Sequence, residues 1–88
     1  MLEIKPTTQF KRDLKVCKKR KKDLNKLSQV VETLAREKEL EPKHKPHALS
    51  GNWSGFWECH IEPDWLLIYQ QTETVLILAR TGTHSDLF

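Results

Sequence analysis

The stretch GFWECHIEPDWLLIYQQTETVLILAR, residues 55–80, decides the fold. In residues 56–61 successive side chains fall on opposite faces, which is the period of a β-strand. Residues 65–70 and 75–80 are two further runs rich in apolar and β-branched residues, and the polar segments EPD and QTET separate the three runs as turns. The sequence therefore predicts three consecutive antiparallel strands.

The residues before this region predict a strand and two helices. LEIKPT, residues 2–7, reads as a short edge strand in which proline limits pairing on one side. Thr7 or Thr8 can cap a first helix and Asp23 a second. Each helix carries one apolar stripe at helical spacing. The stripe residues are Phe10, Leu14 and Cys17 in the first helix, and Leu24, Leu27, Val31 and Leu34 in the second.

The order of elements is then β-α-α-β-β-β, an α+β fold with two N-terminal helices packed on one face of an antiparallel sheet. Residues 40–54 connect the helices to the sheet as a proline- and glycine-containing loop that holds His44, His47 and Trp53. Loops of this kind often serve function because a rigid scaffold can aim their side chains.

The length of 88 residues predicts a single domain, residues 1–88, with a thin hydrophobic core. Because there is no long apolar run and the N-terminus lacks an export pattern, we expect a cytoplasmic protein with no membrane contact. Cys17 and Cys59 are interpreted as free, partly buried thiols.

The two halves of the chain differ in charge. Residues 1–45 carry 14 lysines and arginines against 7 acidic residues, whereas residues 46–88 carry only Arg80 against 5 acidic residues. Eight of the basic side chains lie in residues 11–22, KRDLKVCKKRKK, and include Lys18, Lys19, Arg20 and Lys21. Such a run is commonly a solvated helix face, but it also favours nucleic acid or an acidic protein segment as a partner.

Four titratable side chains are expected to converge at one end of the sheet, namely His47, His60, Asp64 and His84. Histidines titrate near neutrality and can accept and donate protons in one reaction. Cleavage of RNA needs this pairing, because the 2′-hydroxyl loses a proton while the leaving 5′-oxygen gains one, and no metal or other cofactor is required.

Further residues are candidates for substrate contacts. Arg80 would stabilise charge on the phosphoryl oxygens, and Trp65 and Phe88 would stack on splayed bases. The simpler alternatives are that Arg80 pairs with a carboxylate, that Trp65 only packs the core, as we expect for Trp53, and that Asp64 only forms a turn. We take His44 as a surface residue.

A zinc site is a competing interpretation. His44-x-x-His47 together with Cys59, His60 or His84 offers enough ligands. No paired CxxC or HExxH pattern is present, so the sequence favours the metal-free acid–base site over a zinc site.

The segments HALSGNWSGFWECHIEPDWLLIY and LARTGTHSDLF closely resemble the YafQ branch of the RelE superfamily, the toxins of bacterial type II toxin–antitoxin pairs. The H-x-L-x-G loop, the H-I-x-P-D-W turn and the R-x-G-x-H tail keep their order and spacing. The resemblance implies a RelE-like microbial RNase fold and a ribosome-dependent messenger-RNA endonuclease that cuts the message in the decoding site.

The resemblance also implies roles and partners. His47, His60, Asp64 and His84 would be catalytic, with Trp65 and Phe88 beside the substrate. Asp64, or a histidine that it orients, would be the general base; His84 would be the general acid. The implied partners are an antitoxin, messenger RNA, and 16S ribosomal RNA at the basic helices, with operator DNA reached only through the antitoxin.

Trp57 departs from the family pattern, in which many relatives have an arginine that could bind phosphate or a backbone oxygen. Three explanations stay open: a tolerated variant, compensation by Arg80, or lowered activity. The alternative function is a non-catalytic ParE-like toxin or binding module on the same fold.

Overall fold

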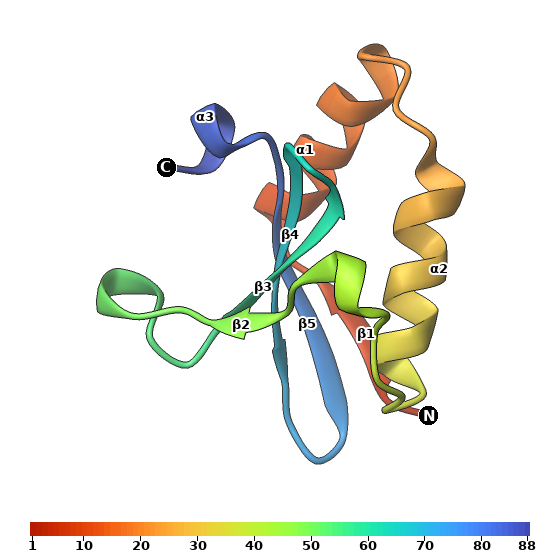
Figure 1. The fold of residues 1–88 in the computed structure, drawn as a ribbon, viewed down its shortest axis with the longest axis vertical. Helices are drawn as coiled ribbons and strands as arrows, with labels where there is room; N and C mark the ends of the chain where they lie inside the picture. The colour runs from red at the N-terminus through yellow and green to blue at the C-terminus, as the bar shows by residue number, and fades with distance from the viewer.

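The computed structural model describes all 88 residues, and its sheet has five strands in the spatial order β1-β5-β4-β3-β2 (Figure 1). The strands are β1 (Glu3–Pro6), β2 (His47–Ala48), β3 (Trp57–Glu62), β4 (Trp65–Gln71) and β5 (Val75–Gly82). The helices are α1 (Thr8–Lys19), α2 (Leu24–Ala35) and α3 (His84–Leu87), with two short 3-10 turns, η1 (Pro42–His44) and η2 (Gly51–Trp53). The predicted α+β class and the β-α-α-β-β-β order are confirmed.

Three details go beyond the prediction. β1 pairs in parallel with β5, so the sheet is mixed, although β3, β4 and β5 pair antiparallel as expected. The short strand β2 forms within the loop after α2 and adds an outer edge beside β3. The tail forms α3 because Thr83 and Asp86 make a reciprocal capping box.

The two long helices begin where the sequence predicts. The hydroxyl of Thr7 accepts a hydrogen bond from the backbone N–H of Phe10 at 3.0 Å, and the carboxylate of Asp23 accepts one from Asn25 at 3.0 Å. Both caps satisfy amide groups that a helix start leaves unpaired.

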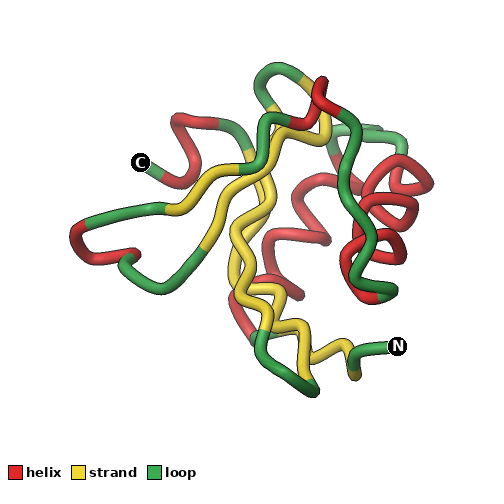
Figure 2. The backbone as a smooth tube through the Cα atoms, turned by 60° about the horizontal axis from the view of Figure 1, so that its bottom comes forward, coloured by secondary structure: helices red, strands yellow, loops and turns green.

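The sheet is covered on both faces, and the two covers differ (Figure 2). α1 and α2 cover one face and enclose the larger hydrophobic core, in which Cys17 and Cys59 are both buried and unpaired. The other face carries a smaller cluster under the η1–η2 loop and α3. Its members are Leu66, Ile68, Ala79 and Leu87, with Leu49, Trp53 and Phe56 packed against them. The face of the sheet under α1 and α2 therefore holds most of the buried core, and the thinner face remains for a site.

None of the helices has the length and apolar character needed to span a membrane.

Candidate active site

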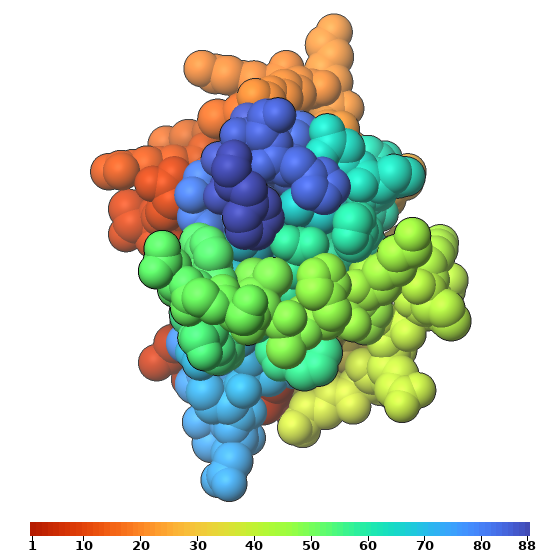
Figure 3. Space-filling view, turned by 60° about the vertical axis from the view of Figure 1, so that its left-hand side comes forward, coloured from red at the N-terminus to blue at the C-terminus, as the bar shows by residue number.

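The candidate site lies on the face of the sheet that α1 and α2 do not cover. Figure 3 shows the C-terminal segment, in blue, between the β3–β4 turn and the loop that precedes β3. β3 supplies Glu58 and His60, the β3–β4 turn supplies Asp64, β2 supplies His47, and α3 begins with His84. Segments distant in sequence therefore converge at one place, as predicted.

The local structure of β3 helps to aim these side chains. The register between β3 and β4 shifts between His60 and Glu62, which is the signature of a β-bulge. The turn that follows contains Pro63, whose carbonyl oxygen accepts a hydrogen bond from His60 Nδ1 at 3.2 Å. The bulge and the rigid turn thus fix the orientation of the His60 ring.

Asp64 holds His84 through two contacts. Asp64 Oδ1 lies 2.6 Å from His84 Nδ1 and 2.9 Å from the His84 backbone nitrogen. The backbone N–H and then the imidazole lower the pKa of the Asp64 carboxyl below its usual value. Because a carboxylate only accepts, His84 Nδ1 carries the proton and Nε2 is left free.

His47 is oriented in the same way. Its Nδ1 lies 3.0 Å from the carbonyl oxygen of Lys45, which can only accept, so Nε2 again stays free. Lys45 has a left-handed backbone conformation, with φ of 43°, where the chain turns from η1 into β2. The rings of His60 and His84 lie with their centroids 5.8 Å apart.

Glu58 is a functional candidate that the sequence did not single out. Its side chain is only 8% exposed, yet its Oε1 lies 3.5 Å from His47 Nε2 and 3.8 Å from His60 Nε2. Both distances exceed the usual length of a hydrogen bond. A buried carboxylate normally needs close partners, and these two histidines are the nearest ones. The signal in the sequence was that Glu58 shares a strand face with His60.

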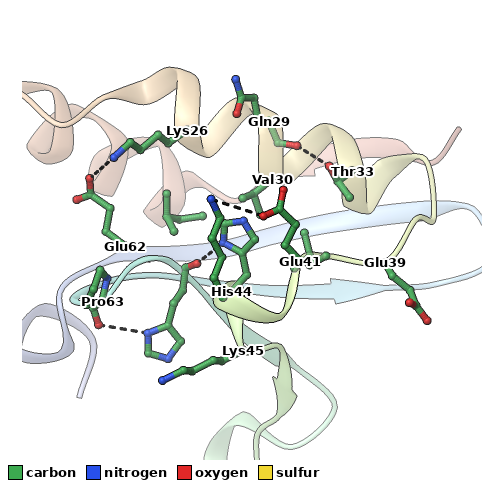
Figure 4. A pocket seen from close by; sticks show the side chains of 14 residues that line it. Lys26, Gln29, Val30, Thr33, Glu39, Glu41, His44, Lys45, Glu62 and Pro63 are labelled. Carbon is green, nitrogen blue, oxygen red and sulfur yellow. Dashed lines mark hydrogen bonds and ion pairs between the residues drawn. The ribbon is translucent and has the colours of Figure 1, made fainter.

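His44, which we expected at the surface, is partly buried and lies beside the site. Its Nδ1 is 2.6 Å from the backbone carbonyl oxygen of His60. It lines an open cavity of about 750 Å³ between α2 and the η1 loop. Lys26, Glu41 and Lys45 also line this cavity (Figure 4). His44 thus ties the loop to β3.

The structure contradicts the predicted substrate contact of Trp65 and gives Arg80 a partner within the chain. The Trp65 side chain has no exposed surface, and its indole N–H donates to Thr81 Oγ1 at 2.9 Å, so it cannot stack on a base. Arg80 Nε and Nη2 lie 2.7 and 3.1 Å from the two carboxylate oxygens of Asp13 on α1. Trp65 therefore packs the core. Arg80 pairs with a carboxylate, and its contact with the phosphate stays a prediction.

Phe88 and the basic run remain accessible. Phe88 is 63% exposed directly after α3. Lys18, Lys19 and Lys21 are exposed at the end of α1. Arg20 forms an ion pair with Asp86 at 2.6 Å, two residues beyond His84. This contact joins the basic segment to the element that carries a candidate catalytic residue.

The ligand set of the zinc interpretation does not assemble as expected. Cys59 is fully buried in the core on the helix side, and burial raises its pKa to about 12. His44 Nδ1 is engaged by the His60 carbonyl group. A different set does come together, because one ligand atom from each of Glu58, His60 and His84 lies within 4.8 Å of the others.

Comparison with known proteins gives the class of the molecule. The family model described as the bacterial toxin of type II toxin–antitoxin system, YafQ, matches residues 2–88. The chain is 41% identical over 87 residues to the mRNA interferase toxin YafQ of Escherichia coli K12, covering 98% of this chain and 95% of the relative.

Solved structures agree with this match. The chain resembles the crystal structure of the E. coli DinJ–YafQ toxin–antitoxin complex, with a TM-score of 0.92, 41% identity, and 99% and 97% of the two chains covered. It also resembles a metal-bound toxin from Helicobacter pylori, with a TM-score of 0.94, 47% identity and full coverage of both chains.

The fold and these matches define a toxin of a bacterial type II toxin–antitoxin system. Within that class, the chain belongs to the YafQ family. The family resemblance predicted from the HALSGNWSGFWECHIEPDWLLIY and LARTGTHSDLF segments is confirmed.

Proposed function

We propose that the chain is an endoribonuclease toxin that cuts messenger RNA in the decoding site of the ribosome. The name of the relative at 41% identity, an mRNA interferase toxin, supports the activity. The observation that carries the proposal is the shared orientation of three histidines. His47, His60 and His84 each donate Nδ1–H to an oxygen, so each leaves Nε2 available.

The proposed reaction is transfer of the phosphodiester to the neighbouring 2′-hydroxyl. His60 Nε2 takes the 2′-hydroxyl proton as the oxygen attacks phosphorus, and Glu58 at 3.8 Å stabilises the imidazolium. The bond from phosphorus to the 5′-oxygen breaks, and His84 Nε2 gives that oxygen its proton. The products are a 2′,3′-cyclic phosphate and a 5′-hydroxyl.

Asp64 acts through His84 in this scheme. Its lowered pKa makes it a weak base, so we assign the proton acceptor to His60 and not to Asp64. By accepting from His84 Nδ1 at 2.6 Å, the Asp64 carboxylate holds the ring so that Nε2 stays available for the leaving oxygen. His47 Nε2, 3.5 Å from Glu58, would position the phosphate.

The proposed partners follow from charge and from the relatives. Lys18, Lys19 and Lys21 would contact ribosomal RNA phosphates, and binding of this kind weakens as salt increases. Since a relative of this chain is solved as a toxin–antitoxin complex with DinJ, we propose a cognate antitoxin as the protein partner. Operator DNA would be reached only through that antitoxin.

The test is cleavage of a defined message on programmed ribosomes, with new 5′ ends mapped by primer extension. His84→Ala and Asp64→Asn run alongside the wild-type chain, and naked message serves as the control for ribosome dependence. Cuts at fixed codon positions that are lost in His84→Ala support the proposal. An intact message with both the wild-type and the Trp57→Arg chains would overturn it in favour of a non-catalytic, ParE-like binding module.

A further inference from the structure

We propose that Arg20 is a positioning residue for the nuclease: it holds α3 through Asp86 and thereby places the His84 side chain for proton transfer. Arg20 would affect the reaction without touching RNA, which differs from the phosphate contact that the basic run predicts for it. This inference rests on the proposed function, because His84 is the general acid in that scheme.

The α3 helix cannot keep its place unaided. It is a single turn, His84–Leu87, and so short a helix is unstable by itself, because its few hydrogen bonds do not offset the cost of fixing the backbone. The capping box between Thr83 and Asp86 closes the turn but does not attach it to the rest of the protein. The position of His84 therefore depends on contacts between α3 and other elements.

Three contacts attach α3. Leu87 packs in the smaller hydrophobic cluster, and Asp64 accepts two hydrogen bonds from His84. The third contact is the ion pair with α1, in which Arg20 Nη1 lies 2.6 Å from Asp86 Oδ2 and Nη2 lies 3.2 Å from Oδ1. Because a bidentate pair of this kind fixes direction as well as distance, Arg20 orients the turn that begins with His84.

The anchor is itself on a firm base. Arg20 is the C-cap of α1, and its backbone N–H donates to the carbonyl oxygen of Val16 at 3.0 Å. Asp13 lies seven residues earlier, on the same side of the helix. Its carboxylate accepts from Arg80 Nε at 2.7 Å and from the Thr81 backbone N–H at 3.1 Å. α1 therefore holds the end of β5 with one residue and α3 with the other.

Gly82 permits the close approach of Asp86 to β5. A Cβ atom at position 82 would lie 2.9 Å from Asp86 Oδ2 and 3.0 Å from Asp86 Cβ, closer than non-bonded atoms normally approach. The same carboxylate accepts from the Thr83 backbone N–H at 2.9 Å. The glycine of the R-x-G-x-H tail thus leaves room for Asp86 to reach Arg20.

The test is single-turnover cleavage on programmed ribosomes at several concentrations of the chain, with Arg20→Ala, Asp86→Asn and the double variant. The asparagine keeps an acceptor for the Thr83 N–H and removes the charge. Each single variant should lower the maximal rate roughly tenfold and leave the half-saturating concentration unchanged, since slight misplacement of a catalytic group costs up to about 10²-fold. The double variant should lose no more, because both changes break one ion pair.

Three further variants sharpen the comparison. Arg20→Lys restores the charge without the bidentate geometry and should fall between wild type and Arg20→Ala. Arg36→Ala, which breaks an exposed pair with Glu32, is the matched control and should cut as the wild type does. Lys19→Ala should raise the half-saturating concentration and keep the maximal rate, as expected of a phosphate contact. Circular dichroism checks that each variant is folded.

Two kinetic results would overturn the inference. One is a wild-type maximal rate in Arg20→Ala, with or without a raised half-saturating concentration, and a raised half-saturating concentration would return Arg20 to the substrate contacts. The other is a double variant whose loss is the product of the two single losses.

A measurement on the free chain separates this inference from the proposed function. Long-range ¹H–¹⁵N correlation spectra of the histidine rings should show the proton of neutral His84 on Nδ1 in wild type and in Arg36→Ala, and a mixture of both tautomers in Arg20→Ala. The same tautomer in wild type and Arg20→Ala would overturn the positioning role. A wild-type chain that shows the expected tautomers yet leaves the message whole would contradict the proposed function, while the hold of Arg20 on His84 would stand.

Discussion

Asp64 Oδ1 accepts two hydrogen bonds from His84, one from the imidazole Nδ1 at 2.6 Å and one from the backbone nitrogen at 2.9 Å. One carboxylate oxygen therefore fixes both the start of α3 and the tautomer of the ring that it presents. A turn residue of the sheet and a residue of the C-terminal helix thus act as one unit.

We expect the two members of this unit to differ in their effect on cleavage. His84→Ala removes the proposed acid and should lower the cleavage rate by about 10²–10⁴-fold. Asp64→Asn keeps an acceptor for both hydrogen bonds but removes the charge, so its loss should be smaller, roughly tenfold or more. Single-turnover cleavage on programmed ribosomes measures both. A larger loss in Asp64→Asn than in His84→Ala would contradict the assignment.

Glu58→Gln should lower cleavage by roughly 10–100-fold without destabilising the fold. The substitution keeps the shape of a largely buried side chain whose two histidine neighbours lie 3.5 and 3.8 Å away, so the free energy of unfolding should change little. Cleavage assays and urea unfolding measure the two quantities. The control is Glu73→Gln, and equal cleavage by the two variants would remove Glu58 from the mechanism.

Arg80→Ala should act on stability. It leaves the Asp13 carboxylate, whose side chain is 9% exposed, without its cationic partner, and breaking a buried pair costs about 3–5 kcal/mol. Arg36→Ala is the matched control, because the exposed pair of Arg36 with Glu32 should contribute less than about 1 kcal/mol. Urea unfolding measures both. A stable Arg80→Ala chain that fails to cut RNA would restore Arg80 as a substrate contact.

Trp57→Arg should raise cleavage by roughly 3- to 10-fold. Trp57 is 44% exposed at the start of β3, where an arginine could form a charge-assisted hydrogen bond to phosphate, partly weakened by solvent. The rate of cleavage at fixed codons is the measurement, and Trp57→Gln controls for the loss of the indole. No gain in Trp57→Arg would indicate that Trp57 is a tolerated variant.

Asp86 should make stability depend on acid pH. The Arg20 side chain and then the Thr83 backbone N–H lower the Asp86 pKa to about 2. Because the folded-state pKa lies below the unfolded-state value near about 4, the stabilisation is complete above that pH and is lost as the pH falls toward 2. Thermal unfolding between pH 2 and 6 should therefore show a shallower acid dependence in Asp86→Asn. An identical slope in the two proteins would rule out this linkage.

The elements and most of the site follow from local patterns. The alternation in β3, the apolar stripes of α1 and α2, and the caps at Thr7 and Asp23 are each visible within a few residues. His60 and Asp64 are near in sequence, and strand order brings His84 to them.

The rest depends on contacts between distant residues. Arg80 forms an ion pair with Asp13, which lies 67 positions earlier in the chain, and no local sequence pattern indicates this pair. Trp65 lies in a run that is apolar on both faces, so the pattern does not reveal that its indole turns inward to Thr81. The loop forms β2 along the outer edge of β3, where His47 pairs with Glu58, and a local pattern does not show this contact.

β4 lies at the centre of the sheet and is flanked by β5 and β3, whereas the chemistry is carried by a few side chains of β2 and β3, by a turn and by the start of α3. The residues that stabilise the fold and the residues that carry the chemistry are therefore largely different, so selection for stability and selection for activity act on separate positions. A bacterium under pressure to disarm this molecule has many single-codon routes that leave a well-folded chain. Quality-control proteases recognise unfolded chain, which such a variant does not expose. Inactive but folded variants should therefore remain at the abundance of the active protein.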